Sequence, residues 1–292
     1  MSVAFGIQGS GQQVSRPVPD AGRLRELAQT VEELGYDSIW AGDHISYRNP
    51  ILDVVVALST FAAVTERITL GAGIVLLPLR QPGVVAKEFA SLDYVSRGRV
   101  ILGVGVGGEG EKDFEAVGVD RGERGARTNE AMRALRALFG PQPASFSGRF
   151  YSFADVEIAP ASPRESGPPL WVGGRSEAAI RRAAELGDGW IPIFVSPERF
   201  GRGRVLLPAH VTPAVTVPAH VGPKQRLLEH LRRRYSGVSE HVVDRYCVAG
   251  TPEECVARVR EYVDAGARHV VFNLGEAEDA ERLAEVARAA AG

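Results

Sequence analysis

The sequence predicts an α/β protein in which residues 1–292 form one domain, a single (β/α)8 barrel. Eight short runs rich in β-branched residues alternate with amphipathic stretches of helical period, and eight parallel strands are the number that closes a barrel. A chain of 292 residues, 45% of them hydrophobic, can bury the core of one such barrel. A doubly wound open sheet is the alternative that this alternation leaves open.

The expected strands are short and rich in Val and Ile, as strands of a buried parallel sheet are. In chain order they are residues 3–8, 38–43, 68–77, 100–106, 169–174, 189–195, 214–220 and 269–274. The pattern at 214–220 is the weakest of the eight.

The expected helices show apolar residues at helical spacing and signals at their ends. Helix 20–34 stops before Gly35, which stands where a C-cap belongs. Helix 251–265 opens on a capping box of Thr251 and Glu254. The other helices are expected at residues 51–64, 84–96, 124–139, 176–186 and 279–290.

Two segments interrupt the alternation. Residues 140–168 are rich in Pro, Gly and Ser without a clear period, so we expect a long loop with room for a small hairpin. Residues 196–213 should hold the helix between the sixth and seventh strands, yet they contain Gly201, Gly203, Pro208 and Pro213. An irregular segment, and no full-length helix, is expected there.

Composition excludes several classes of protein. A formal net charge of −2 offers no attraction for nucleic acid or an anionic membrane, and no apolar run approaches the roughly 18 residues of a membrane span. The first residues resemble a strand, so we expect no signal peptide and a cytoplasmic location. Cys247 and Cys255 lack the spacing of a disulfide framework or metal site, and no metal role is expected for His210 and His220.

The carboxyl ends of the strands are where a barrel of this kind places its active site. Asp43 and His44 end the second strand, and alternation sends their side chains to opposite sides of the backbone. One can face the barrel mouth, where a histidine can act as acid, base or hydrogen-bond donor near neutral pH, while the other braces the loop. The alternative is a surface histidine beside a turn-capping aspartate.

Glycines cluster at the end of the fourth strand. Gly103, Gly105, Gly107 and Gly108 weaken a strand, so they are expected to permit the close approach of a ligand or of another backbone. The spacing is not the dinucleotide fingerprint, because no helix with a suitably placed acid follows at once.

A second glycine pair ends the fifth strand. Gly173 and Gly174 precede Ser176, the expected N-cap of a helix whose bare backbone amides would form an anion site, and Arg175 could add positive charge. Two glycine clusters at consecutive strand ends indicate a planar cofactor that bears a phosphate.

Three acids follow the fourth strand. Glu109 is the carboxylate expected to point toward the pocket. Glu111 and Asp113 are interpreted as parts of an acidic, solvated loop.

At these residues the sequence resembles the luciferase-like monooxygenase class. The matching stretches are GYDSIWAGDH (35–44), TERITLGAGIVLLPLRQP (65–82), VAKEFASLDYVSRGRVILGVGVGG (85–108), ERGARTNEAMRALRALF (123–139), PPLWVGGRSEAAIRRAAELGDGWIP (168–192) and AGTPEECVARVREYVDAGARHVVF (249–272). The resemblance implies a TIM-like barrel, usually a homodimer, that uses FMN or the deazaflavin coenzyme F420. It is weakest between Phe200 and Arg245, which leaves the substrate-side wall undetermined.

The Asp43–His44 pair is similar to the deazaflavin-dependent branch of that class. The resemblance implies that His44 lies near the reactive ring carbon and that Glu109 donates a proton, although Glu109 stands one residue later than in the class pattern. It also implies a non-prolyl cis peptide at Gly73–Ile74 behind the ring. The expected cofactor-binding residues are Asp43, Gly73, Ile74, Val75, Gly107, Gly108, Gly173, Gly174, Arg175 and Ser176.

The resulting interpretation is an oxidoreductase that transfers a hydride between F420 and a small organic substrate. The first alternative is an FMN-dependent monooxygenase that receives reduced flavin from a separate reductase. The second is a flavin-binding barrel without catalytic activity. A metal-dependent hydrolase is disfavoured because the expected strand ends lack clustered His and Asp ligands.

Overall fold

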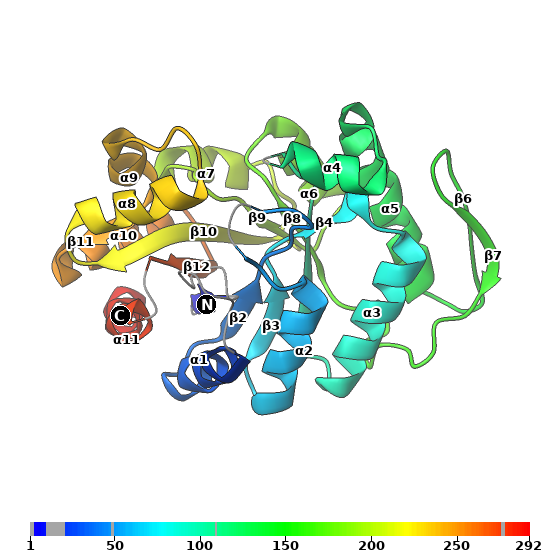
Figure 1. Cartoon of the computed structure of the whole chain (residues 1–292), viewed down its shortest axis with the longest axis horizontal. Coiled ribbons are helices and arrows are strands. Elements are labelled where there is room, and N and C mark those ends of the chain that lie inside the picture. Colours follow the sequence, from blue (N-terminus) through cyan, green and yellow to red (C-terminus); the bar gives the residue numbers. More distant parts are fainter. Residues whose placement is uncertain (1–2, 10–20, 48–49, 109, 276–277) are drawn as a thin grey trace.

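The computed structural model describes residues 3–9, 21–47, 50–108, 110–275 and 278–292. In this part of the chain, eight parallel strands form a closed barrel surrounded by helices (Figure 1). In barrel order they are β1 (Ala4–Gln8), β2 (Ser38–Ala41), β3 (Thr69–Ala72), β5 (Val100–Gly105), β8 (Leu170–Gly173), β9 (Gly189–Ile191), β10 (Thr212–Val221) and β12 (His269–Leu274). The ring closes where Ile7 of β1 pairs with Phe272 of β12, so the predicted barrel is confirmed and the open sheet is wrong.

Seven helices that the sequence predicts are present in the described residues. They are α1 (Ala21–Glu33), α2 (Val54–Val64), α3 (Pro82–Val95), α5 (Arg124–Phe139), α6 (Glu177–Leu186), α10 (Pro252–Asp264) and α11 (Asp279–Ala291). No helix in the described ranges is long and apolar enough to cross a membrane.

Local hydrogen bonds explain where several helices begin and end. The predicted capping box of α10 is present, with Thr251 and Glu254 each satisfying the other's backbone. The side chain of Ser176 accepts a hydrogen bond from the backbone N–H of Ala179 at the start of α6, as expected of its N-cap. Gly35 adopts a φ of +83° after α1, a left-handed conformation that glycine takes readily.

The third strand is interrupted, which the continuous strand predicted at 68–77 did not anticipate. β3 ends at Ala72, and the chain bulges at Gly73–Ile74. It continues as the short strand β4 (Val75–Leu76), which pairs with β5, and a 3-10 turn, η1 (Leu77–Leu79). The bulge projects into the end of the barrel, where the candidate site lies.

The two irregular segments differ from one another. Residues 140–168 contain the expected small hairpin, β6 (Ala144–Ser147) with β7 (Ser152–Val156), which extends outside α5 (Figure 1). Within 196–213 the expectation of an irregular segment is partly wrong, because α7 (Pro197–Arg204) is a regular helix of 8 residues.

The N-terminus of α7 shows two helix-start signals, to which the prediction gave less weight than to the glycines that follow. Ser196 caps it by accepting a hydrogen bond from the backbone N–H of Arg199, and Pro197 stands at its first position. Gly203 lies inside the helix where a larger residue would not fit, because a Cβ there would lie 2.5 Å from the ring of Trp190. Close packing against Trp190, and not an interruption of the helix, explains why glycine is found at this position.

Several shorter elements have no clear pattern in the sequence and were not predicted. They are α4 (Glu111–Val117), η2 (Arg121–Glu123), α8 (Lys224–Arg234), α9 (Glu240–Tyr246) and β11 (Val248–Gly250). The last pairs with the end of β10 alone and adds to the sheet outside the closed ring.

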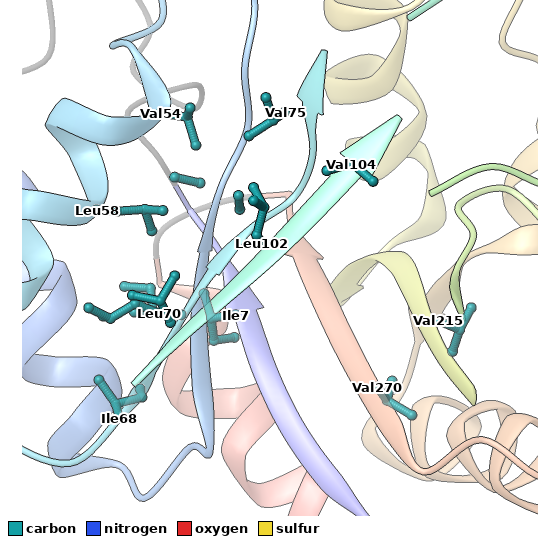
Figure 2. Close-up of a cluster of buried hydrophobic side chains, with 14 of the residues drawn as sticks. Ile7, Val54, Leu58, Ile68, Leu70, Val75, Leu102, Val104, Val215 and Val270 are labelled. Atoms are coloured by element: carbon teal, nitrogen blue, oxygen red, sulfur yellow. The ribbon is translucent and has the colours of Figure 1, made fainter. Parts of the chain in front are cut away.

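The core has two layers. Between the barrel and the helices, α2 side chains such as Val54 and Leu58 lie beside the strand residues Leu70 and Leu102 (Figure 2). Inside the barrel a smaller cluster contains Trp40, Ile101, Trp171, Ile191, Ala214 and Val271. These side chains fill the interior, so an open site can form only at the barrel's end.

Candidate functional site

A pocket of about 280 Å³ lies at the carboxyl ends of the barrel strands, where enzymes of this architecture place their active sites. Each strand of the barrel contributes to it, either directly or through the segment that follows. A larger and more open hollow of about 720 Å³ lies beside Gly222, Thr251 and Arg282. None of the described site residues predicted from the sequence lines that hollow, so the pocket at the barrel end is the candidate site.

The pocket has two chemically different halves. The segments from β3 to β9 contribute mainly glycine backbone and aliphatic side chains, namely Gly73, Ile74, Leu76, Val106, Gly107, Gly108, Gly173, Gly174, Ile191 and Ile193. The segments of β10, β12, β1 and β2 contribute mainly polar and aromatic side chains, namely Thr216, Arg234, Tyr235, Asn273, Gln8, Gly42, Asp43, His44 and Tyr47. Both groups of strands are contiguous in the barrel, so the pocket has an apolar half and a polar half.

The bulge after β3 forms part of the apolar half. The peptide bond between Gly73 and Ile74 is cis, as the family resemblance implied. The carbonyl oxygen of Gly73 accepts a hydrogen bond of 2.7 Å from the side-chain amide of Gln8. Val75, which was also expected to bind the cofactor, instead packs in the hydrophobic core with α2 residues such as Val54 (Figure 2).

Glycines beside the bulge make room for it. A Cβ on Gly105 would lie 1.9 Å from Cδ1 of Ile74, and one on Gly173 would lie 2.7 Å from the same atom. At Gly103 a Cβ would lie 2.1 Å from the backbone oxygen of Ala72. The predicted close approach of another backbone is confirmed at Gly103, whereas Gly105 and Gly173 accommodate the side chain of Ile74.

His44 is held by a buried carboxylate. Its Nδ1 lies 2.8 Å from Oδ2 of Asp113, and the two side chains are 16% and 0% exposed. The other carboxylate oxygen, Oδ1, accepts hydrogen bonds from the backbone N–H groups of Ile45 and Ser46. Asp113 therefore fixes both the imidazole and the loop that follows it.

The interpretation of Asp113 as a solvated loop residue is wrong. It lies on α4, a helix of 7 residues that is too short to reveal an apolar face by periodicity. One turn of this helix brings Asp113 and Phe114 under the loop after β2, and both residues are buried. The local signal in the sequence is the apolar Phe114, which indicates that this turn packs against the core. It does not identify the partner of Asp113.

Asp43 braces the loop that follows β4. Its carboxylate accepts hydrogen bonds from the side chain of Arg80 and from the backbone N–H of Leu76. Arg80 also binds Asp53; burial acts to raise the pKa of Asp53, but the hydrogen bond and charge of Arg80 outweigh it and lower that pKa. Asp43 lines the pocket, but its carboxylate is bound by Arg80. His44 is the residue of the pair whose side chain is oriented by Asp113.

The predicted phosphate segment lies at the start of α6. Gly173 and Gly174 line the pocket, whereas Arg175 and Ser176 are exposed just beyond it. Gly174 has a φ of +109°, and its carbonyl accepts a hydrogen bond from the indole N–H of Trp190. The carbonyl and the conformation of Gly174 together orient the first amides of α6 near the pocket rim.

Six residues of the polar half had no sequence signal, namely Gln8, Tyr47, Thr216, Arg234, Tyr235 and Asn273. Tyr47 stacks on His44 with a ring distance of 4.3 Å, and its hydroxyl donates a hydrogen bond to the carbonyl oxygen of Arg234. The guanidinium of Arg234 donates to Oδ1 of Asn273, and Tyr235 lies beside it. Tyr47, Arg234 and Tyr235 come from segments where the sequence pattern was weak. Gln8, Thr216 and Asn273 are single polar residues within strands.

Glu109, the expected proton donor, lies outside the described residues. Within the described ranges, no group of three or more His, Cys, Asp or Glu side chains could hold a metal ion. Cys247 and Cys255 are buried and unbridged, and burial raises the pKa of each thiol to about 12.

Comparison with known proteins gives this geometry a family. Residues 1–210 match the family described as luciferase-like monooxygenase. The chain belongs to this family. An F420-dependent glucose-6-phosphate dehydrogenase of Beutenbergia cavernae is 32% identical over 316 residues, which cover 89% of the present chain and 90% of the relative. As a family member with such relatives, the protein is an oxidoreductase.

Solved structures share the fold of this luciferase-like chain at low sequence identity. An F420-dependent secondary alcohol dehydrogenase in complex with an F420–acetone adduct superposes with a TM-score of 0.86 at 20% identity, covering 99% of both chains. The FMN complex of the oxygenating constituent of 3,6-diketocamphane monooxygenase from Pseudomonas putida superposes with a TM-score of 0.77 at 15% identity, again covering 99% of both. Deazaflavin and flavin proteins thus share this barrel.

Proposed function

We propose that this luciferase-like protein transfers a hydride between coenzyme F420 and a small organic substrate. The observation that carries the proposal is the position of His44, held by Asp113 on the polar half of the pocket next to the glycine-lined bulge. The F420-dependent relative that is 32% identical across 89% of the chain supports the choice of cofactor.

The residues of the apolar half fit a planar cofactor. Backbone at Gly107, Gly108, Gly173 and Gly174 forms this wall without side chains, so a ring can approach the main chain closely. Ile74 would support the ring from behind, and the first amides of α6 would bind a phosphate. When bound, the deazaflavin supplies the hydride chemistry that no protein side chain provides.

Proton transfer would fall to the polar half. A carboxylate can only accept, so the proton of a neutral His44 lies on Nδ1 and its Nε2 is a free lone pair. That nitrogen would take the substrate's hydroxyl proton as the carbon loses its hydride, and return a proton in the reverse direction. Glu109 is proposed as a second proton donor.

The decisive experiment is a side-by-side titration of the purified protein with F420 and FMN. Tight binding of F420, with reduction or oxidation of its ring on addition of alcohols or carbonyl compounds, is expected. Productive FMN binding with oxygen consumption, given reduced flavin by a separate reductase, would instead favour the monooxygenase, whose fold the FMN-bound neighbour shares. Any turnover excludes a non-catalytic flavin-binding barrel.

We also propose that the chain is one domain and assembles as a homodimer. Val56 on α2 and Val84, Tyr94 and Val95 on α3 are exposed apolar side chains on two neighbouring helices, which a second copy could cover. Sedimentation analysis tests the dimer. The cytoplasmic location stays a prediction.

A further inference from the structure

We propose that the substrate is a small neutral diol, and that its second hydroxyl binds between the side-chain amides of Gln8 and Asn273. This inference rests on the proposed hydride transfer and adds a substrate class to it. The carbon of the first alcohol loses a hydride to the deazaflavin, and the proton of that hydroxyl passes to Nε2 of His44, which leaves a hydroxy ketone or hydroxy aldehyde. The second hydroxyl is unchanged and serves only for binding.

Gln8 and Asn273 are neighbours on two paired strands. Gln8 is the last residue of β1, and its Cα is paired with that of Asn273 on β12. Both residues line the pocket, and they are only 7% and 4% exposed. Because paired strands lie about 4.8 Å apart, the two side chains form one continuous patch on the pocket wall, the amide pair.

The orientation of the Gln8 amide is fixed by the bulge after β3. Its nitrogen, Nε2, donates a hydrogen bond of 2.7 Å to the carbonyl oxygen of Gly73. A carbonyl oxygen can only accept, so the nitrogen of this amide must face Gly73 and the oxygen, Oε1, must face away from it. Gln8 therefore contributes an acceptor to the amide pair.

The Asn273 amide has the opposite polarity. Its oxygen, Oδ1, accepts a hydrogen bond of 2.9 Å from Nη1 of Arg234. A guanidinium only donates, so this orientation holds whatever other groups Arg234 contacts. The nitrogen of the amide, Nδ2, faces away from Arg234, and Asn273 therefore contributes a donor.

Both of these atoms open into the pocket. Among the described residues, no protein group hydrogen-bonds to Oε1 of Gln8 or to Nδ2 of Asn273. The buried side-chain atoms that lack a partner in the same part of the chain lie on other residues. The small exposed fraction of each amide therefore faces the cavity that the two residues line.

An acceptor beside a donor matches a ligand group that both donates and accepts. A hydroxyl can donate to Oε1 of Gln8 and accept from Nδ2 of Asn273. A carboxylate or an ether only accepts, so it would leave Oε1 without a donor, and an alkyl group would leave both amide atoms unsatisfied. A carboxamide has both functions but is larger, and the cavity of about 280 Å³ must also receive the cofactor ring.

The amide pair lies beside the segment that carries the proposed proton acceptor. β1 pairs with β12 on one side and with β2 on the other, and His44 follows β2. The side chain of His44 is oriented by Asp113 at 2.8 Å and lines the same polar half of the pocket. A molecule bound to the amide pair by one hydroxyl therefore directs its neighbouring alcohol carbon toward His44.

The first test compares substrates with the wild-type protein and F420. Propylene glycol is measured against 2-butanol, in which a methyl group replaces the second hydroxyl, and lactate and lactamide are further arms. The diol is expected to be favoured in kcat/KM by about 10- to 100-fold, the combined range of two neutral hydrogen bonds. Equal or better turnover of 2-butanol, lactate or lactamide overturns the proposal.

The second test measures the same preference in variants of the amide pair. Asn273→Leu and Gln8→Met each remove one hydrogen bond to the second hydroxyl, so each should lower the ratio of kcat/KM for propylene glycol over 2-butanol by about 3- to 10-fold. General damage affects both substrates and cancels in this ratio. The matched control is Asn129→Leu, because the oxygen of Asn129 accepts from Arg182 outside the pocket. An unchanged ratio in both pocket variants overturns the proposal.

A binding measurement gives a readout without turnover, and it needs no variant to fold. Hydroxyacetone and butanone are the products that propylene glycol and 2-butanol would give, and neither can react with oxidised F420. Calorimetry on the wild-type protein loaded with oxidised F420 should show tighter binding of hydroxyacetone, by about tenfold or more. Equal Kd values for the two ketones contradict the role of the amide pair.

The two levels of inference fail differently. Absence of F420 binding in the cofactor titration would refute the proposed function. F420 binding with equal turnover of propylene glycol and 2-butanol would refute the diol proposal alone.

Discussion

The carboxylate of Asp113 lies 2.8 Å from Nδ1 of His44, and this buried contact joins residues 69 positions apart. One carboxylate oxygen accepts from the imidazole, and the other accepts from the backbone N–H of Ser46 at 2.6 Å. The contact sets the ring orientation and leaves Nε2 for the pocket.

Replacement of His44 by alanine should abolish most catalysis without loss of cofactor. Turnover is expected to fall by about 10²–10⁴, the usual cost of removing a general acid or base. Cofactor affinity should hold, because ring and phosphate contacts come mainly from backbone. Turnover and cofactor affinity are measured on the same variant, with His241→Ala, an exposed histidine of α9, as the control. A parallel loss of affinity and thermal stability would show that His44 only braces the loop.

Asp113→Asn should slow the reaction through the tautomer of His44. The asparagine oxygen can still accept from the loop, but its NH₂ group opposes Nδ1–H and favours the tautomer with the proton on Nε2. A loss of about 10² or more is expected. Glu115→Gln on the same helix is the control. An unchanged kcat in Asp113→Asn, with cofactor affinity also unchanged, would contradict the positioning role.

Gly174→Leu should weaken cofactor binding by about tenfold or more, because anion contacts at a helix N-terminus contribute up to ~2 kcal/mol. Gly174 has a φ of +109°, so part of any effect could come from backbone strain. Gly35→Leu introduces a side chain at a φ of +83° with no atom within 4 Å, far from the pocket, and serves as the matched control. Equal cofactor affinity in both variants would place the phosphate elsewhere.

Gly105→Ala should destabilise the protein by about 1–3 kcal/mol, the typical cost of overpacking. Its Cβ would lie 1.9 Å from Cδ1 of Ile74, and Ile74→Val removes that atom. The double variant should therefore recover stability, which would appear as a favourable coupling energy in a double-mutant cycle of urea unfolding. Additive effects would mean that Gly105 matters for another reason.

Acid should destabilise the fold partly through His269. Burial lowers the pKa of His269 to about 4, and its Nε2 lies 2.7 Å from the hydroxyl of Ser38. Below about pH 6.5 the unfolded chain binds a proton that the folded chain refuses, so stability falls as the pH drops toward 4, by up to about 1.4 kcal/mol per pH unit. Burial lowers the pKa of His230 to about 4 as well, so that histidine adds to the slope.

The variant His269→Gln tests this contribution. It keeps an acceptor for Ser38 but removes the titrating group, so urea midpoints measured from pH 7.5 to 5 should decline less steeply than in the wild type. His210→Gln, at an exposed position, should decline as the wild type does. Identical slopes for His269→Gln and the wild type would assign the acid sensitivity to other groups.

The sequence by itself determined the barrel and the edge at which the pocket lies. Strand and helix periods are local properties, so α5 could be predicted at 124–139, where it is found, and the capping box at Thr251 marked the start of α10. Once the alternation indicated a barrel, the strand-end rule brought His44, Gly73 and Gly174 to one pocket. The cis bond at Gly73–Ile74 came from the resemblance and not from any period.

Only the tertiary structure decided which side chains meet in that pocket. Asp113 on a helix of 7 residues and Arg234 at the end of α8 acquire their roles from partners far away in sequence, such as His44 and Asn273. A short helix has too few turns to reveal its buried face, and an arginine among three reveals nothing about which one turns inward. Burial and pairing depend on the packing of distant segments, because the environment of a charged group is set by its neighbours in space.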